Sequence, residues 1–166
     1  GHYNNKDYAN AISYAEKVLS NGKVDTKVIE DAKVIIARSS FKSDDFLTAE
    51  EFFNEVSKKA TGELKAESLY YNAFFLNEHK DYETSNKAIQ DLIANYSSYK
   101  YWGVKSYIIM AKNYYALKDA YQATYILENI IKNFTQYKDV LEEAKNELRN
   151  IKNKEAKTNE SVTNQN

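Results

Sequence analysis

The chain has 166 residues, of which 43% are hydrophobic, so it can bury the core of one domain but is short for two independent ones. Its 23 basic and 24 acidic residues are mixed along the sequence and give a formal net charge of -1, which excludes the basic patch of a typical nucleic-acid-binding protein. The absence of cysteine excludes disulfides, thiolate metal sites and cysteine nucleophiles.

The composition predicts an all-α fold. The sequence has no proline and only 4 glycines, whereas alanine, leucine, lysine and glutamate are plentiful. No apolar run approaches the roughly 20 residues of a membrane span and no signal-peptide core is present, so we expect a soluble chain without membrane insertion. The first residues, Gly1 and His2, lack an initiator methionine. We interpret them as an expression-tag remnant, and the chain as a fragment of a longer protein.

The helical periodicity of apolar residues predicts eight helices in chain order. They are expected at residues 4–20, 26–42, 45–60, 63–78, 82–95, 99–117, 120–133 and 136–153. The last of them has its apolar positions on one stripe and charges around the rest, which is typical of a helix that caps a stack. The polar, aperiodic residues 153–166 are expected to form a disordered tail.

An internal repeat joins these helices into pairs. Four times an aspartate stands four residues before a small residue, and the small residues lie 38, 36 and 38 residues apart, the length of a two-helix repeat. We expect the aspartate to cap the second helix of each pair, and the small residue to let two helix backbones approach closely. The matches are Asp7 and Ala11, Asp45 and Ala49, Asp81 and Ser85, and Asp119 and Ala123.

This unit resembles the tetratricopeptide repeat (TPR), whose two helices each carry a small residue in the middle and whose second helix opens with an aromatic residue. The small residues of the first helices correspond to Ala37, Ala73 and Ala111. The resemblance covers residues 3–152 as one half repeat, three full repeats and a capping helix. It implies a right-handed α-solenoid of antiparallel helix hairpins.

The chain departs from the family pattern at several positions, so we call it TPR-like. Lys33, Leu69 and Tyr107 replace the tryptophan of the first helix, lysine or aspartate replaces the turn glycine, and the closing proline is absent. Residues 96–151 also resemble the C-terminal end of long repeat proteins from Bacteroidetes-type bacteria, many of which are exported. That second resemblance implies a bacterial protein of the periplasm or cell envelope.

The TPR-like resemblance implies a non-catalytic scaffold that binds a protein or peptide in the concave groove lined by the first helices. Aromatic side chains would offer apolar pockets to an extended or helical peptide, and cations would meet its carboxylates. For each single residue the alternative is ordinary packing between repeats or a solvated cation. The candidate protein-binding groove consists of Arg38, Phe41, Tyr70, Phe74, Asn77, Lys105, Ile108, Lys112 and Tyr115.

Two other classes of function stay open. The first helix has the second-helix signature but no first-helix partner before it, so its apolar edge is expected to pair with another copy. This favours a structural alternative, a spacer or self-assembly segment of a longer cell-envelope repeat protein. An enzyme is not expected, because the sequence has no phosphate-binding glycine loop, metal-spaced histidine cluster or nucleophile motif. For the same reason we expect no cofactor and no metal.

Overall fold

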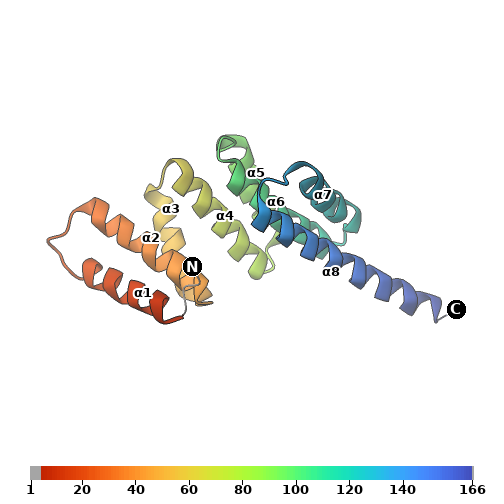
Figure 1. The fold of residues 1–166 in the computed structure, drawn as a ribbon, viewed down its shortest axis with the longest axis horizontal. Helices are drawn as coiled ribbons and strands as arrows, with labels where there is room; N and C mark the ends of the chain where they lie inside the picture. The colour runs from red at the N-terminus through yellow and green to blue at the C-terminus, as the bar shows by residue number, and fades with distance from the viewer. Residues whose placement is uncertain (1–4, 166) are drawn as a thin grey trace. The chain divides into compact units, whose positions relative to one another are not determined.

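The computed structural model describes residues 5–165, and this part of the chain forms eight α-helices and no strand, which confirms the predicted all-α class (Figure 1). The expected tag remnant at residues 1–2 lies outside the described residues, as does the expected start of the repeat domain at residue 3. The helices are α1 (Asn5–Leu19), α2 (Thr26–Lys42), α3 (Phe46–Lys59), α4 (Gly62–Glu78), α5 (Tyr82–Asn95), α6 (Lys100–Ala116), α7 (Ala120–Asn133) and α8 (Lys138–Thr163).

The chain divides into two compact units, and the boundary between residues 72 and 73 falls within α4. The single repeat domain that the sequence predicts over residues 3–152 stays a prediction. Within the first unit, α1 packs on α2 and α2 on α3. Within the second, α5 packs on α6, α6 on α7 and α7 on α8, and α6 also contacts α8. Packing of consecutive helices is therefore shown inside each unit, while the right-handed solenoid stays a prediction.

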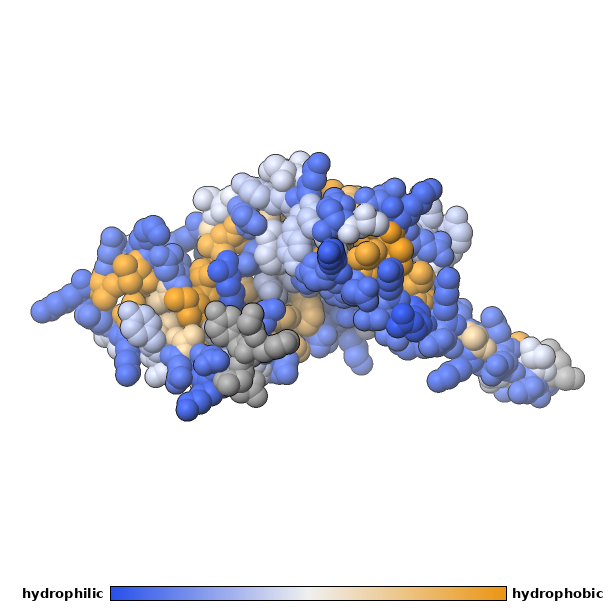
Figure 2. Space-filling model, in the orientation of Figure 1, coloured by the Kyte–Doolittle hydropathy of each residue, from blue (hydrophilic) through white to orange (hydrophobic). Residues whose placement is uncertain are grey.

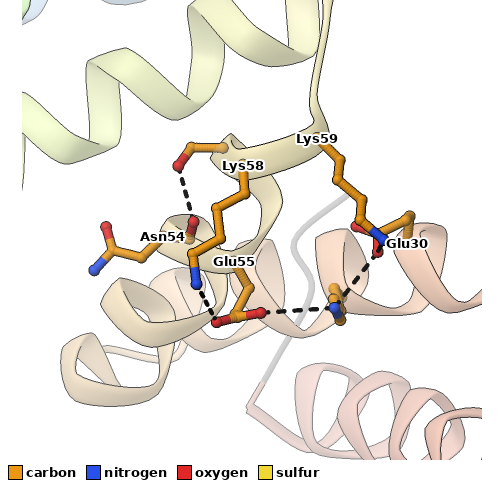
Figure 3. Close-up of polar contacts among 7 residues, drawn as sticks. Glu30, Asn54, Glu55, Lys58 and Lys59 are labelled. Atoms are coloured by element: carbon orange, nitrogen blue, oxygen red, sulfur yellow. Dashed lines mark hydrogen bonds and ion pairs between the residues drawn. The ribbon is translucent and has the colours of Figure 1, made fainter.

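The first unit is held by an apolar core and by a chain of ion pairs. Its core includes Ala15, Ala32 and Ile36, which are at most 3% exposed. At one edge, the ammonium group of Lys33 lies 3.4 Å from Glu30 of its own helix and 3.7 Å from Glu55 of α3. Lys58 pairs with Glu55 within α3, and Lys59 pairs with Glu30, so two of these four ion pairs join α2 to α3 (Figure 3). Because several of these charges are partly exposed, they supplement the apolar contact between the helices and do not replace it.

The second unit has a larger core to which α6, α7 and α8 contribute one stripe each. Ala111 of α6 and Ala123 of α7 are both fully buried, as expected for small residues where two helices cross. The core consists of Val104, Ile108, Ala111, Ala123, Leu127, Ile130, Val140, Ala144 and Ile151, flanked by half-buried aromatic residues. The predicted apolar spacing of these helices is therefore confirmed inside this unit.

The same turn connects α2 to α3, α4 to α5 and α6 to α7. In each turn one non-glycine residue has a left-handed backbone, with φ of 64° at Asp44, 63° at Lys80 and 71° at Lys118. The next residue donates its N–H to a carbonyl oxygen five residues earlier, which is the hydrogen bond of a Schellman motif. These bonds join Asp45 to Ser40, Asp81 to Leu76 and Asp119 to Tyr114 over 2.9, 2.9 and 2.8 Å.

Three of the four repeat aspartates stand at helix N-caps, as predicted. The carboxylate of Asp45 accepts a hydrogen bond from the N–H of Thr48, and that of Asp119 accepts one from Gln122. Asp81 occupies the cap position without a side-chain hydrogen bond to the helix. The fourth expectation is wrong, because α1 begins at Asn5 and Asp7 lies inside its first turn. A carboxylate there still stabilises the helix, because it lies near the positive end of the helix dipole.

The last helix is longer than predicted. Residues 153–166 were expected to be disordered, but α8 continues as far as Thr163 and its exposed end extends beyond the other helices of its unit (Figure 1). This end is mostly hydrophilic (Figure 2), so apolar periodicity could not reveal it. Its first residues are anchored, because Glu155 accepts a hydrogen bond from Tyr115 of α6. Helix-forming residues such as Ala156 and Lys157 then extend the helix.

Candidate functional site

The nine predicted groove residues are divided between the two units. The candidate site described below lies within the second unit. Arg38, Phe41 and Tyr70 belong to the first unit, and the other six belong to the second. Among those six, Asn77, Lys112 and Tyr115 line one pocket. The other three lie outside that pocket.

The three predicted residues of the first unit are engaged in packing and pairing. The Nε of Arg38 donates to both carboxylate oxygens of Glu67, over 3.2 and 3.0 Å, although half of its side chain stays exposed. Tyr70 is 4% exposed and thus offers almost no surface to a ligand. The ring of Phe41 lies 4.7 Å from that of Tyr71. These contacts support the alternative of structural packing for this part of the predicted groove.

Three predicted residues of the second unit are also used structurally. Ile108 is 1% exposed and belongs to the core, so it cannot line a groove. Lys105 is 3.4 Å from Glu143 of α8 and also lies over the ring of Tyr101. Phe74 packs edge-on against its neighbour Phe75 at a ring separation of 5.3 Å. Ile108 and Lys105 therefore contact neighbouring helices, whereas Phe74 packs against the next residue of its own helix.

The remaining three residues lie together in a polar pocket of about 220 Å³, which we call the α6–α8 pocket. One face of α6 and one face of α8 form most of it. Lys112, Tyr115 and Ala116 are three and four residues apart, and Glu147, Ile151 and Lys154 are four and seven apart, so each set projects from one side of its helix. The complete lining is Asn77, Tyr82, Lys112, Tyr115, Ala116, Glu147, Ile151 and Lys154.

The charges of this pocket favour an anion. Lys112 and Lys154 contribute two cations, and Glu147 is the one carboxylate among the lining residues. Within the described residues Lys112 forms no ion pair and is partly exposed. The ammonium group of Lys154 lies 5.8 Å from the centre of the Tyr115 ring, within reach of a cation–π interaction. The lining residues therefore carry two positive charges against one negative charge beside an aromatic surface, and the carboxylate of Glu155 accepts a hydrogen bond from the hydroxyl of that aromatic residue.

Tyr115 forms the aromatic wall of the pocket and stays protonated at neutral pH. Its hydroxyl donates a 2.9 Å hydrogen bond to Oε1 of Glu155. Burial, and then the hydrogen bond and negative charge of Glu155, raise the pKa of the Tyr115 hydroxyl above its ordinary value. A neutral phenol that already donates its proton cannot act as a base here. Its role is to hold the position of α8 and to present its ring.

A second hollow of about 240 Å³ lies beside Gly103 on the α5–α6 hairpin. Its lining is apolar and aromatic and includes Leu92, Tyr107 and Phe134, with Lys100 as its one charged residue. A Cβ atom added at Gly103 would lie 3.8 Å from the Leu92 side chain, an ordinary van der Waals contact, so an alanine would fit at this position. We place the candidate site in the α6–α8 pocket instead, because converging polar groups are what fix the orientation of a ligand.

The sequence missed the contribution of α8 to the site. Lys154 falls in the segment that the sequence predicts to be disordered. Glu147 and Ile151 fall in the helix that is predicted to cap the stack. One signal was available, because Glu147, Ile151 and Lys154 continue a single helical face past the predicted end of the helix. Tyr82 is the first residue of α5. The structure shows that it also lines the pocket.

The described residues contain neither a metal-binding cluster nor a membrane-spanning helix. Among residues 5–165 no group of three or more histidine, cysteine, aspartate or glutamate side chains is arranged to hold a metal ion. None of the helices in the described part of the chain has both the length and the apolarity needed to cross a bilayer. Comparison with protein-family models, curated proteins and solved structures finds no match to this chain. Its function must therefore be inferred from the residues of the pocket.

Proposed function

We propose that the second unit is a non-catalytic protein-binding module whose α6–α8 pocket receives a peptide segment that carries a carboxylate. The observation that supports this most is the pair of cations, Lys112 and Lys154, beside the ring of Tyr115. A carboxylate can interact with both ammonium groups, and the apolar part of the same side chain can lie on the ring. Asn77 adds an amide that can bind the main chain of the peptide.

The strength of such an interaction follows from the exposure of these groups. Lys154 is exposed and Lys112 is partly exposed, so each ion pair with the ligand is worth about 0.2–1 kcal/mol and weakens as salt screens it. Apolar contact with Tyr115 and hydrogen bonds to Asn77 have to supply the rest. We therefore expect micromolar dissociation constants, on the order of 1–100 μM, for a short peptide.

We extend the proposal to the fold and describe the chain as a TPR-like right-handed solenoid of a bacterial repeat protein. The support comes from its repeated elements. The three left-handed turns at Asp44, Lys80 and Lys118 recur with the register of the small residues Ala49, Ser85 and Ala123. A location in the periplasm or cell envelope rests on the sequence resemblance of residues 96–151 alone.

A structural spacer or self-assembly segment is the second candidate function, and one observation on α1 favours it. Ala11 is partly exposed, whereas the equivalent Ala49, Ser85 and Ala123 are fully buried. Tyr14 on the same helix is 67% exposed. This apolar surface fits the predicted self-association edge. Concentration-dependent dimerisation that Tyr14→Glu abolishes would support the spacer function.

The test of the main proposal is selection of peptides followed by charge reversal. Phage-displayed random peptides of about twelve residues are selected on the wild-type protein, and the enriched sequences are synthesised. We expect aspartate or glutamate at one preferred position, and about tenfold or more weaker binding to Lys112→Glu/Lys154→Glu by isothermal titration calorimetry. The matched control, Lys132→Glu/Lys145→Glu, reverses two charges outside the pocket and should bind as the wild type does. Equal weakening by both double variants would contradict the proposed site.

A further inference from the structure

A hydrogen-bond network lies next to the α6–α8 pocket and joins α4, α5 and α6. At its centre is Asn113 of α6, which is fully buried. Its amide nitrogen donates to Oγ of Ser85 and to Oδ1 of Asn86, both over 2.8 Å, and its Oδ1 accepts from Nδ2 of Asn77 over 2.8 Å. Ser85 in turn donates to the carbonyl oxygen of Ala73 over 2.7 Å. Every donor and acceptor of the buried Asn113 amide is thus engaged.

The direction of each hydrogen bond in this network follows from the main-chain carbonyl of Ala73. A carbonyl can only accept, so the hydroxyl proton of Ser85 points toward it, and Oγ of Ser85 has to accept from its other neighbour. That neighbour is therefore the amino group of Asn113, which places Oδ1 of Asn113 opposite Asn77. Asn77 must donate to this oxygen through Nδ2. One carbonyl thus determines which end of the Asn77 amide faces its helix neighbour.

Ser85 is also where this repeat differs from the others. The equivalent positions carry Ala11, Ala49 and Ala123, which cannot form the hydrogen bond to Ala73 or to Asn113. A fully buried asparagine in the middle of a core helix is costly unless all its hydrogen bonds are made. Ser85 and Asn113 therefore act together in one hydrogen-bond network. The repeat pattern by itself requires neither residue.

We infer that Asn113 is a positioning residue that orients the Asn77 amide to bind the main chain of a partner peptide. This inference rests on the proposed function. One N–H of Asn77 is used by Asn113, and its Oδ1 and second N–H have no partner among the described residues, so they are left for the pocket that Asn77 lines. An amide held this way can accept from a peptide N–H and donate to a peptide carbonyl of an extended strand. Asn77 binds the main chain of the peptide, and Lys112 and Lys154 bind its acidic side chain.

The test uses the synthetic peptides obtained with the wild type and a double-mutant cycle on Asn77 and Asn113. Asn77→Ala should weaken peptide binding about tenfold, since it removes two hydrogen bonds to the ligand. Asn113→Ala should weaken it to a similar extent without touching the peptide. The double variant should bind about as weakly as either single one, because the two residues act through one amide. Additive losses would overturn the inference.

Two further measurements separate positioning from a general loss of stability. Asn86→Ala removes a partner of Asn113 but leaves its bond to Asn77, so it should lower the melting temperature and keep the peptide affinity within about threefold. In ligand-free protein, the side-chain amide resonance of Asn77 should show one slowly exchanging proton that Asn113→Ala removes. Equal loss of affinity in Asn86→Ala and Asn113→Ala, or an unchanged Asn77 resonance, would overturn the inference.

The failure of this inference can be distinguished from the failure of the proposed function. If the wild type enriches peptides whose binding responds to Lys112→Glu/Lys154→Glu but not to Asn77→Ala or Asn113→Ala, the pocket stands and the positioning role is overturned. If the wild type enriches no peptide, or the peptides ignore all of these variants, the proposed function fails and the inference fails with it.

Discussion

The hydroxyl of Tyr115 on α6 donates a 2.9 Å hydrogen bond to the carboxylate of Glu155 on α8, forty positions further along the chain. The ammonium group of Lys154 lies over the ring of the same tyrosine. One side chain of α6 thus contacts two consecutive residues of α8, just before the part of α8 that extends beyond the other helices of the unit. The two contacts lie where the wall of the pocket meets the exposed end of the helix, because Lys154 lines the pocket and Glu155 is the next residue.

The first prediction concerns the end of α8. Tyr115→Phe removes the hydroxyl that holds Glu155 but keeps the ring beneath Lys154, so the backbone of residues 156–163 should fray more often. Hydrogen exchange of those amides, followed by mass spectrometry, should be several-fold faster, on the order of 3–10 times, for the loss of one hydrogen bond. Tyr114→Phe is the matched control in the neighbouring half-buried position. Unchanged exchange in Tyr115→Phe would show that the contact does not hold the helix.

The second prediction concerns stability in acid. The hydroxyl of Tyr101 donates to Oδ2 of Asp139, at the first turn of α8. Burial by itself raises the pKa of Asp139, but the hydrogen bonds from Tyr101 and from the backbone, together with the charge of Lys105, outweigh it and hold the pKa below its ordinary value. Because the folded-state pKa is lowered, this contribution is present above the unfolded-state pKa and is lost as the pH falls through the folded-state value.

Thermal melts between about pH 5 and about pH 2 should therefore fall less steeply in Asp139→Asn than in the wild type, since the variant has no proton to take up at this position. Tyr101→Phe should also flatten the acid limb, because it removes the hydroxyl that favours the carboxylate. Tyr137→Phe, whose ring lies 5.7 Å from that of Tyr101, is the control. Parallel acid limbs in all four proteins would contradict the assignment.

The third prediction concerns the repeated turn. Lys118 has a φ of 71°, a conformation that costs a lysine more than a glycine. Lys118→Gly should raise the free energy of unfolding by about 0.5–1 kcal/mol, and Lys118→Val should lower it, in urea denaturation. The control Lys132→Gly lies in the last turn of α7 and should lower stability by up to about 1 kcal/mol. A loss of stability in Lys118→Gly similar to that in Lys132→Gly would contradict the turn assignment.

Much of the fold follows from local patterns in the sequence. Residues 26–42, 82–95 and 120–133 were predicted with the bounds that the structure shows, because each stretch has a strong apolar stripe or a clear capping aspartate. The hairpin turns followed from the position of Asp45, Asp81 and Asp119. These are short-range effects of periodicity and capping, which a single sequence contains.

The site was harder to predict, because it depends on which face of a helix meets a neighbour. Ile108 and Lys112 are four residues apart on α6, yet the first is buried in the core and the second lines the pocket. Helical spacing alone places them on the same stripe. The polar end of α8 has no apolar stripe, so the sequence predicts neither its helix nor the pocket residue Lys154. Both are seen only with the tertiary contacts to Tyr115. The buried Asn113 could be interpreted only when its three hydrogen-bond partners were known.

The most direct test of the proposed function is a titration of the isotope-labelled wild-type protein with one selected acidic peptide, followed by two-dimensional ¹⁵N–¹H NMR. The proposal predicts that the largest shifts map to the side-chain amide of Asn77 and to the backbone around Lys112, Tyr115 and Lys154. Those shifts should be lost in Lys112→Glu/Lys154→Glu. Shifts confined to the hollow beside Gly103, or to α1, would contradict the assignment of the binding site to the α6–α8 pocket.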